Sequence, residues 1–157
     1  MNAEYLVRVV RTADRVLAAG KANGLFGDEM NGWLAIAPKN QGLVLSVRTS
    51  ELPEPMAMAC RVQAEAHVEW LCTRDRLTSS VKDGESEDEV VAAVAVKAYD
   101  FYLGYASSAP RLKVEAFAVV TTIRLQQFSS TMALSRQWQL YTNIHIGELL
   151  EITNDIQ

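Results

Sequence analysis

The stretch "CRVQAEAHVEWLC", residues 60–72, decides the fold because it fits two kinds of element. Apolar and polar residues alternate from Cys60 to Trp70, as in a strand that is buried on one side. Ala, Gln, Glu and Leu are nevertheless good helix formers, and Pro53 or Pro55 would suit the first turn of a helix. Over this length, the two-residue period of the apolar positions is a stronger signal than the helix preference of the individual residues. We therefore favour a strand and keep a helix as the alternative.

A strand would place Glu65, His67 and Glu69 on one side of the sheet, at intervals of about 7 Å. His145 has the same parity on a later predicted strand, so a neighbouring strand would add a second imidazole. A carboxylate beside a histidine is typical of general acid–base catalysis, and alternate strand positions also serve metal sites. The simpler interpretation, which we favour, is that this side of the strand faces water. We expect no metal, and these four residues stand only as catalytic candidates.

Helical periodicity predicts a helix near the N-terminus, with Asn2 as its cap. The runs "WLAIA" (33–37) and "LVLSVRT" (43–49), separated by "PKNQG", predict a hairpin. Ser86 and Glu89 form a capping box, which predicts a helix to about Tyr105. The β-branched and aromatic residues of the last third predict two long strands, over 112–128 and 134–152.

Together these elements predict an α+β fold in one domain, residues 1–157, in the order α-β-β-β-α-β-β. We expect a curved, mainly antiparallel sheet of four to five strands, with both helices packed on one face. A chain of 157 residues is long enough to bury roughly 70% of the surface of its unfolded form.

Composition limits the classes of partner. The net charge is −4 and no Lys/Arg cluster occurs, so we expect no nucleic-acid partner. The longest apolar run, Val90 to Val96, is too short to cross a bilayer, and charged residues interrupt the start of the chain where a signal peptide would be apolar. Cys60 and Cys72 lie too far apart to pair if one continuous element joins them. Two reduced thiols suit a reducing compartment, so we expect a cytoplasmic protein.

The predicted helix over 86–105 is apolar nearly all round, which is typical of a helix covered on more than one side. A second chain could supply that cover. We therefore expect a small, soluble interaction or adaptor module, a homodimer or a partner of another protein, without a catalytic motif or cofactor. The alternative is a domain or enzyme that holds a small apolar molecule in a cavity between the sheet and this helix. That cavity would be lined by Tyr99, Phe101, Tyr102, Tyr105 and Trp138.

Overall fold

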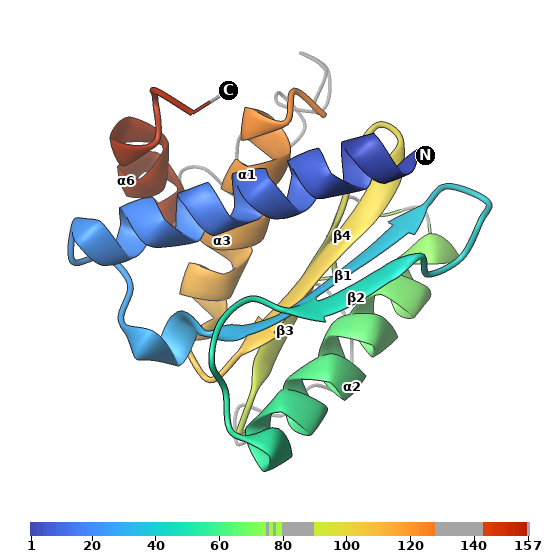
Figure 1. Ribbon diagram of the computed structural model, residues 1–157, viewed down its shortest axis with the longest axis horizontal. Coiled ribbons are helices and arrows are strands. Elements are labelled where there is room, and N and C mark those ends of the chain that lie inside the picture. The colour runs from blue at the N-terminus through green and yellow to red at the C-terminus, as the bar shows by residue number, and fades with distance from the viewer. Residues whose placement is uncertain (75, 77, 80–89, 128–142, 157) are drawn as a thin grey trace.

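The computed structural model describes residues 1–74, 76, 78–79, 90–127 and 143–156. In this part of the chain, four α-helices surround a sheet of four strands (Figure 1). Every neighbouring pair of strands is antiparallel, and the sheet order is β2-β1-β4-β3. The helices are α1 (Ala3–Ala22), α2 (Glu54–Cys72), α3 (Arg111–Arg124) and α6 (Ile144–Ile152), and the strands are β1 (Gly32–Pro38), β2 (Leu45–Arg48), β3 (Ala92–Lys97) and β4 (Phe101–Ser107). A short 3-10 helix, Asp28–Met30, leads into β1.

The N-terminal helix and the hairpin are confirmed. The Asn2 side chain caps α1 by accepting a hydrogen bond from the Tyr5 amide at 2.8 Å. β1 and β2 pair with Leu34 opposite Val47, and the loop between them places Asn40 and Gly42 at positive φ. Asn and Gly tolerate that conformation better than other residues, so the "PKNQG" loop can reverse the chain tightly.

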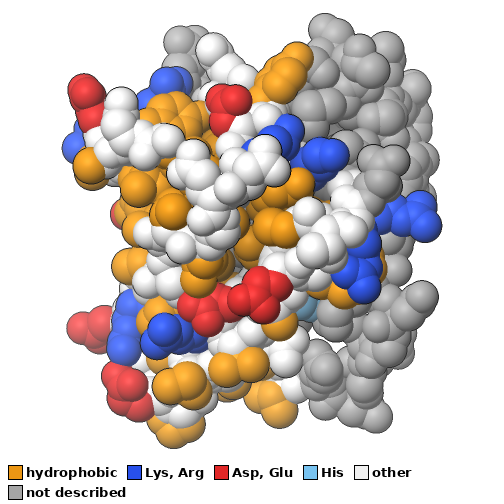
Figure 2. Space-filling model, turned by 90° about the vertical axis from the view of Figure 1, so that its right-hand side faces the viewer, with side chains coloured by type: hydrophobic (Ala, Val, Ile, Leu, Met, Phe, Trp, Pro, Cys, Tyr) orange, Lys and Arg blue, Asp and Glu red, His pale blue; other side chains and the backbone are white. Residues whose placement is uncertain are grey.

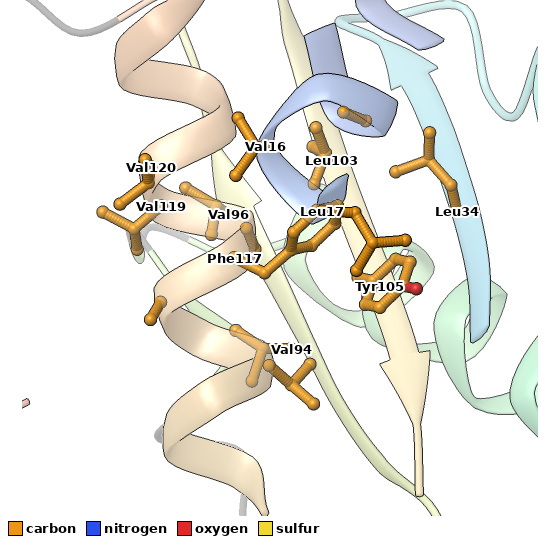
Figure 3. Packing of buried hydrophobic residues seen from close by; sticks show 14 of the residues in the cluster. Val16, Leu17, Leu34, Val94, Val96, Leu103, Tyr105, Phe117, Val119 and Val120 are labelled. Carbon is orange, nitrogen blue, oxygen red and sulfur yellow. The ribbon is translucent and has the colours of Figure 1, made fainter. Parts of the chain in front are cut away.

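The two faces of the sheet carry side chains of different size. Large residues alternate with small ones along each central strand, since successive side chains point to opposite faces. The large set faces α1, α3 and α6 and comprises Leu34, Ile36, Val94, Val96, Phe101, Leu103 and Tyr105. Figure 3 shows this set meeting Val16 and Leu17 from α1 and Phe117 from α3, with the Phe117 and Tyr105 ring centroids 4.4 Å apart.

The small set faces α2. It comprises Ala35, Ala37, Ala93, Ala95 and Ala106, beside the larger Tyr102 and Trp33 of the same face, with Cys60, Ala64, Val68 and Leu71 packed on it from the helix. Gly104 of β4 lies directly beneath α2, where an added Cβ would stand 2.5 Å from Val68 Cγ2 and 2.9 Å from the Ala64 carbonyl oxygen. The small side chains thus allow α2 to lie close to the sheet. Helices cover both faces, so the prediction of two helices on one face was wrong (Figure 1).

The strand predicted over 60–72 was wrong, because α2 is helical from Glu54 to Cys72 with proline in its first turn. The helix predicted to reach Tyr105 was also wrong: β3 and β4 occupy that region, while Ser86 and Glu89 lie outside the described residues. Both strands are buried on two faces, which removes the polar–apolar alternation that identifies a strand. Two buried strands in succession, the first of them rich in alanine, therefore resemble one apolar helix in the sequence.

The last third is helical where the structure describes it, so the two predicted strands were wrong there. α3 covers most of 112–128, and nine consecutive residues, Val114–Thr122, are buried in it. α6 covers the end of 134–152, and the rest of that range lies outside the described residues. Mixed α and β structure with an antiparallel sheet is confirmed; the predicted order of elements is not. Among the described helices, none has both the length and the hydrophobicity required to cross a membrane.

Candidate functional site

The grouping of Glu65, His67 and Glu69 does not exist in the structure. Residues two apart on a helix point about 200° away from each other, whereas residues four apart share a side. Glu69 accordingly lies exposed on the outside of α2 and Glu65 lies half-buried where α2 borders β2, while His67 points inward and is fully buried. The prediction that all three face the same way was wrong because the stretch is a helix.

His67 is held by a buried serine. Its Nδ1 lies 2.6 Å from the Ser79 hydroxyl, which also accepts the Ala95 backbone amide at 2.6 Å. Since the hydroxyl oxygen already accepts that amide, its own hydrogen is available to Nδ1. Both side chains have no exposed surface, so this contact joins α2 to β3 in the interior and does not face solvent.

His145 lies far from this contact in the fold. It belongs to α6, which packs on α3 and α1, whereas His67 belongs to α2 on the opposite face of the sheet. The nearest acidic partner of His145 is Glu148, with 3.4 Å between Nδ1 and Oε1. The two imidazoles therefore form no joint site, and within the described residues no group of three His, Cys, Asp or Glu side chains could hold a metal ion.

The aromatic candidates also separate. Phe101 and Tyr105 are buried in the core toward α1 and α3, while Tyr102 faces α2. Tyr99 is half exposed in the turn between β3 and β4, and Trp138 lies outside the described residues. The cavity hypothesis required a helix over 86–105 as one wall, and strands stand there in its place.

The two cysteines are free, and neither is activated. Cys60 is buried against the sheet, and burial raises the pKa of its thiol to about 11. Cys72 is exposed at the end of α2; partial burial and then the nearby Glu69 carboxylate raise the pKa of its thiol. A nucleophilic cysteine needs a lowered pKa, so both thiols are poorly suited to that chemistry at neutral pH.

The outward face of α2 carries apolar side chains that the sequence interpretation missed. Met58, Val62, Ala66 and Trp70 follow one another at four-residue spacing, and we call this row the outer ridge of α2. Met58 is 57% exposed and Val62 is 52% exposed, while Ala66 and Trp70 are half-buried. The outer ridge is thus a row of apolar side chains on the outside of a helix whose inner side is already packed.

Charged residues run beside the outer ridge. Arg61, Glu65 and Glu69 form a parallel row, in which Arg61 Nε and Glu65 Oε1 are 3.3 Å apart. Glu65 also accepts a hydrogen bond from Ser46 at 2.8 Å, whereas Glu69 has no ion pair within the described residues. At the end of the ridge the Arg74 guanidinium stacks 4.7 Å from the Trp70 ring centroid. The ridge therefore has a polar border of both signs.

A helical wheel drawn over residues 54–72 would have shown this surface. It separates an inner set, Ala57, Cys60, Ala64, His67, Val68 and Leu71, from the outer ridge. The ridge also explains the misleading alternation, because Val62, Ala66 and Trp70 are apolar at positions that a single-faced helix would make polar.

No protein-family model matches this chain, and comparisons with curated proteins and with solved structures find no match either.

Proposed function

We propose that this chain is a small protein-interaction module that forms a homodimer through the outer ridge of α2. The observation that supports the proposal is the row of exposed apolar side chains, centred on Met58 and Val62, on a helix whose inner side is already packed. Burying exposed apolar area on association is favourable by about 25 cal/mol per Å² before the costs of association are subtracted.

The ridge is suited to contact with its own copy. Most homodimers have twofold symmetry, which makes each surface its own partner. Two α2 helices packed antiparallel about the middle of the ridge bring Met58 of one copy near Trp70 of the other, and Val62 near Ala66. The same arrangement brings Arg61 beside the Glu65 and Glu69 row of the second copy. Charges of opposite sign at the border then favour this pairing over a shifted one.

The test is the oligomeric state of the purified chain over a range of concentrations, measured by analytical ultracentrifugation. We expect a monomer–dimer equilibrium that Val62→Glu weakens by at least about tenfold, or about 1.4 kcal/mol, because a carboxylate at the centre of the ridge meets apolar side chains and Glu65. Val7→Glu is the matched control, since Val7 is 53% exposed on α1 and Val62 is 52% exposed on α2. The control should dimerise as the parent chain does.

A charge exchange gives a second check on the register. Arg61→Glu and Glu69→Arg should each weaken the dimer, and the double variant should recover it, because the double variant restores opposite charges across the twofold axis. A parent chain that stays monomeric at millimolar concentration would contradict the proposal. Equal dimerisation of the Val62→Glu variant would contradict it as well.

A further inference from the structure

A second apolar surface lies on the other side of the sheet, between the flank of α1 and β2. Leu6, Val7 and Val10 of α1 and Leu45 of β2 line an open groove of about 370 Å³, with Arg11 and Asp14 at its rim. Two further exposed apolar residues, Leu43 and Val44, precede β2 in the chain. Viewed from the side at which the β1–β2 hairpin ends, hydrophobic side chains reach the surface at many points between charged ones (Figure 2).

The backbone beside this groove has hydrogen-bonding groups to offer. β2 stands at the end of the sheet order, and among the described residues it pairs with β1 alone. The Thr49 amide donates to the Gly32 carbonyl at 3.0 Å. Because every second residue of an antiparallel strand bonds to the same neighbour, the backbone N–H and C=O groups of Val47 also point toward β1. Ser46 and Arg48, which alternate with these residues, direct their backbone N–H and C=O groups away from the sheet. Such an edge is a template for another strand.

The edge and the groove are parts of one surface. The side chains of Leu45 and Val47 lie on the α1 face of the sheet, where they pack against the large-residue core. A strand added beside β2, about 4.8 Å away, would place every second side chain under the flank of α1, against Leu6 and Val10. Main-chain hydrogen bonds would then fix the added strand, and the groove would select its side chains.

The charge at the rim selects among such strands. Asp14 lines the groove and has no ion pair within the described residues, and partial burial raises the pKa of its carboxyl group. A cation beside Asp14 would offset that unfavourable desolvation of the carboxylate. Arg11, one turn away on the same helix, forms no ion pair with it. The net charge of −4 also favours a basic partner over an acidic one.

We infer that the α1–β2 groove binds an extended segment of another protein as an additional strand on β2, with apolar side chains against Leu6 and Val10 and a lysine or arginine beside Asp14. This site uses none of the residues of the outer ridge of α2. The inference goes beyond the proposed homodimer and does not depend on it.

The first experiment selects ligands without assuming their sequence. A phage library of short random peptides is panned on the immobilised full chain and, in parallel, on the Val7→Glu variant. We expect peptides in which apolar residues alternate and a Lys or Arg occupies the same parity, because alternate side chains share a face. They should be retained by the Val62→Glu control, whose dimer ridge is altered and whose groove is intact. Failure to enrich any peptide on the parent chain over the Val7→Glu variant overturns the inference.

The second experiment locates the bound peptide. Amide hydrogen exchange of the chain is followed by NMR with and without the best selected peptide. We expect exchange of the Ser46 and Arg48 amides to slow by at least about tenfold at saturation, since an added strand would give them hydrogen bonds that no described residue of the free chain provides. A peptide that is N-methylated at alternate residues should lose binding, and Asp14→Asn should weaken binding of the basic peptide by about two- to tenfold.

Three outcomes of the second experiment would also overturn the inference. The peptide could protect α2 and leave Ser46 and Arg48 unchanged, which would assign it to the outer ridge. N-methylation could have no effect, which would leave only nonspecific apolar contact. In the Val62→Glu variant without any peptide, the Ser46 and Arg48 amides could become protected as the protein concentration rises, which would make a second copy of the chain the occupant of the edge. Loss of the homodimer with retention of peptide binding would contradict the proposed function and support this site.

Discussion

Replacement of Gly104 by alanine tests whether α2 lies as close to the sheet as its small side chains allow. The added Cβ would stand 2.5 Å from Val68 Cγ2 and 2.9 Å from the Ala64 carbonyl oxygen. Carbon atoms in ordinary contact are about 3.5–4.0 Å apart, so α2 must shift by about 1 Å or Val68 must leave its position. Inserting a methyl group into such a contact costs about 1–3 kcal/mol of unfolding free energy.

The assay is urea and thermal unfolding at fixed protein concentration. For a chain of this length we expect the melting temperature of Gly104→Ala to fall by about 2–12 °C. Gly147→Ala is the matched control, because Gly147 lies within α6 and an added Cβ there meets nothing within 4 Å. Alanine is the better helix former, so this control should be more stable than the parent chain by about 0.5–1 kcal/mol.

A double variant separates the steric contact from any other effect of the substitution. Val68→Ala removes the Cγ2 atom that the new Cβ would meet, so Gly104→Ala should cost less in that background, with an interaction energy of about 0.5–3 kcal/mol. The reasoning would be refuted if Gly104→Ala were as stable as the parent chain. Strictly additive effects of Gly104→Ala and Val68→Ala would refute it too.

Three further predictions concern the interior beneath α2 and the two cysteines of that helix. Ser79→Ala should lower the unfolding free energy by about 1–3 kcal/mol, because it removes the hydroxyl group that bonds the buried Ala95 amide and His67 Nδ1. Ser46→Ala is the control at a half-buried site, and it should lower the unfolding free energy less. Both are measured by urea unfolding. The unfolding free energy should fall at high pH because of Cys60. Burial raises the pKa of its thiol to about 11 in the folded chain, whereas an unfolded thiol loses its proton near pH 8.5. The stability that this thiol contributes is present below about pH 8.5 and is lost as the pH rises to about 11. The assay is urea unfolding of the parent chain and of Cys60→Ala from neutral pH to about pH 10. A difference in unfolding free energy between the two chains that stays constant with pH would refute the prediction. In the native chain, a thiol reagent should modify the exposed Cys72, and it should reach the buried Cys60 only after denaturant is added.

The N-terminal third was predictable because local signals and the tertiary structure agree there. Asn2 caps α1 from within its own first turn, and the inner row of α1 recurs at helical spacing. The loop between β1 and β2 contains the residues that a tight reversal requires. These features depend on residues close in sequence, so they can be recognised without knowing what packs on them.

The candidate site was not predictable in the same way. The strand interpretation of residues 60–72 placed Glu65, His67 and Glu69 together, and the helix separates His67 from both carboxylates. The misleading alternation comes from the outer ridge, in which Val62 is exposed and Ala66 and Trp70 are half-buried. Apolar residues on both the inner and the outer side of a helix thus imitate the two-residue period of a strand.

The sequence by itself determined the class of the molecule, the first helix and the hairpin, because composition, caps and turn residues act locally. Only the tertiary structure decided the identity of the last two-thirds. β3 and β4 are covered on both faces, and α3 is enclosed by the sheet, α1 and α6, so none of them has a solvent side to reveal its period. Both proposed contact surfaces depend on tertiary structure, because α2 packs its inner side on a face rich in alanine and leaves its ridge outward, while β2 ends the described sheet beside α1.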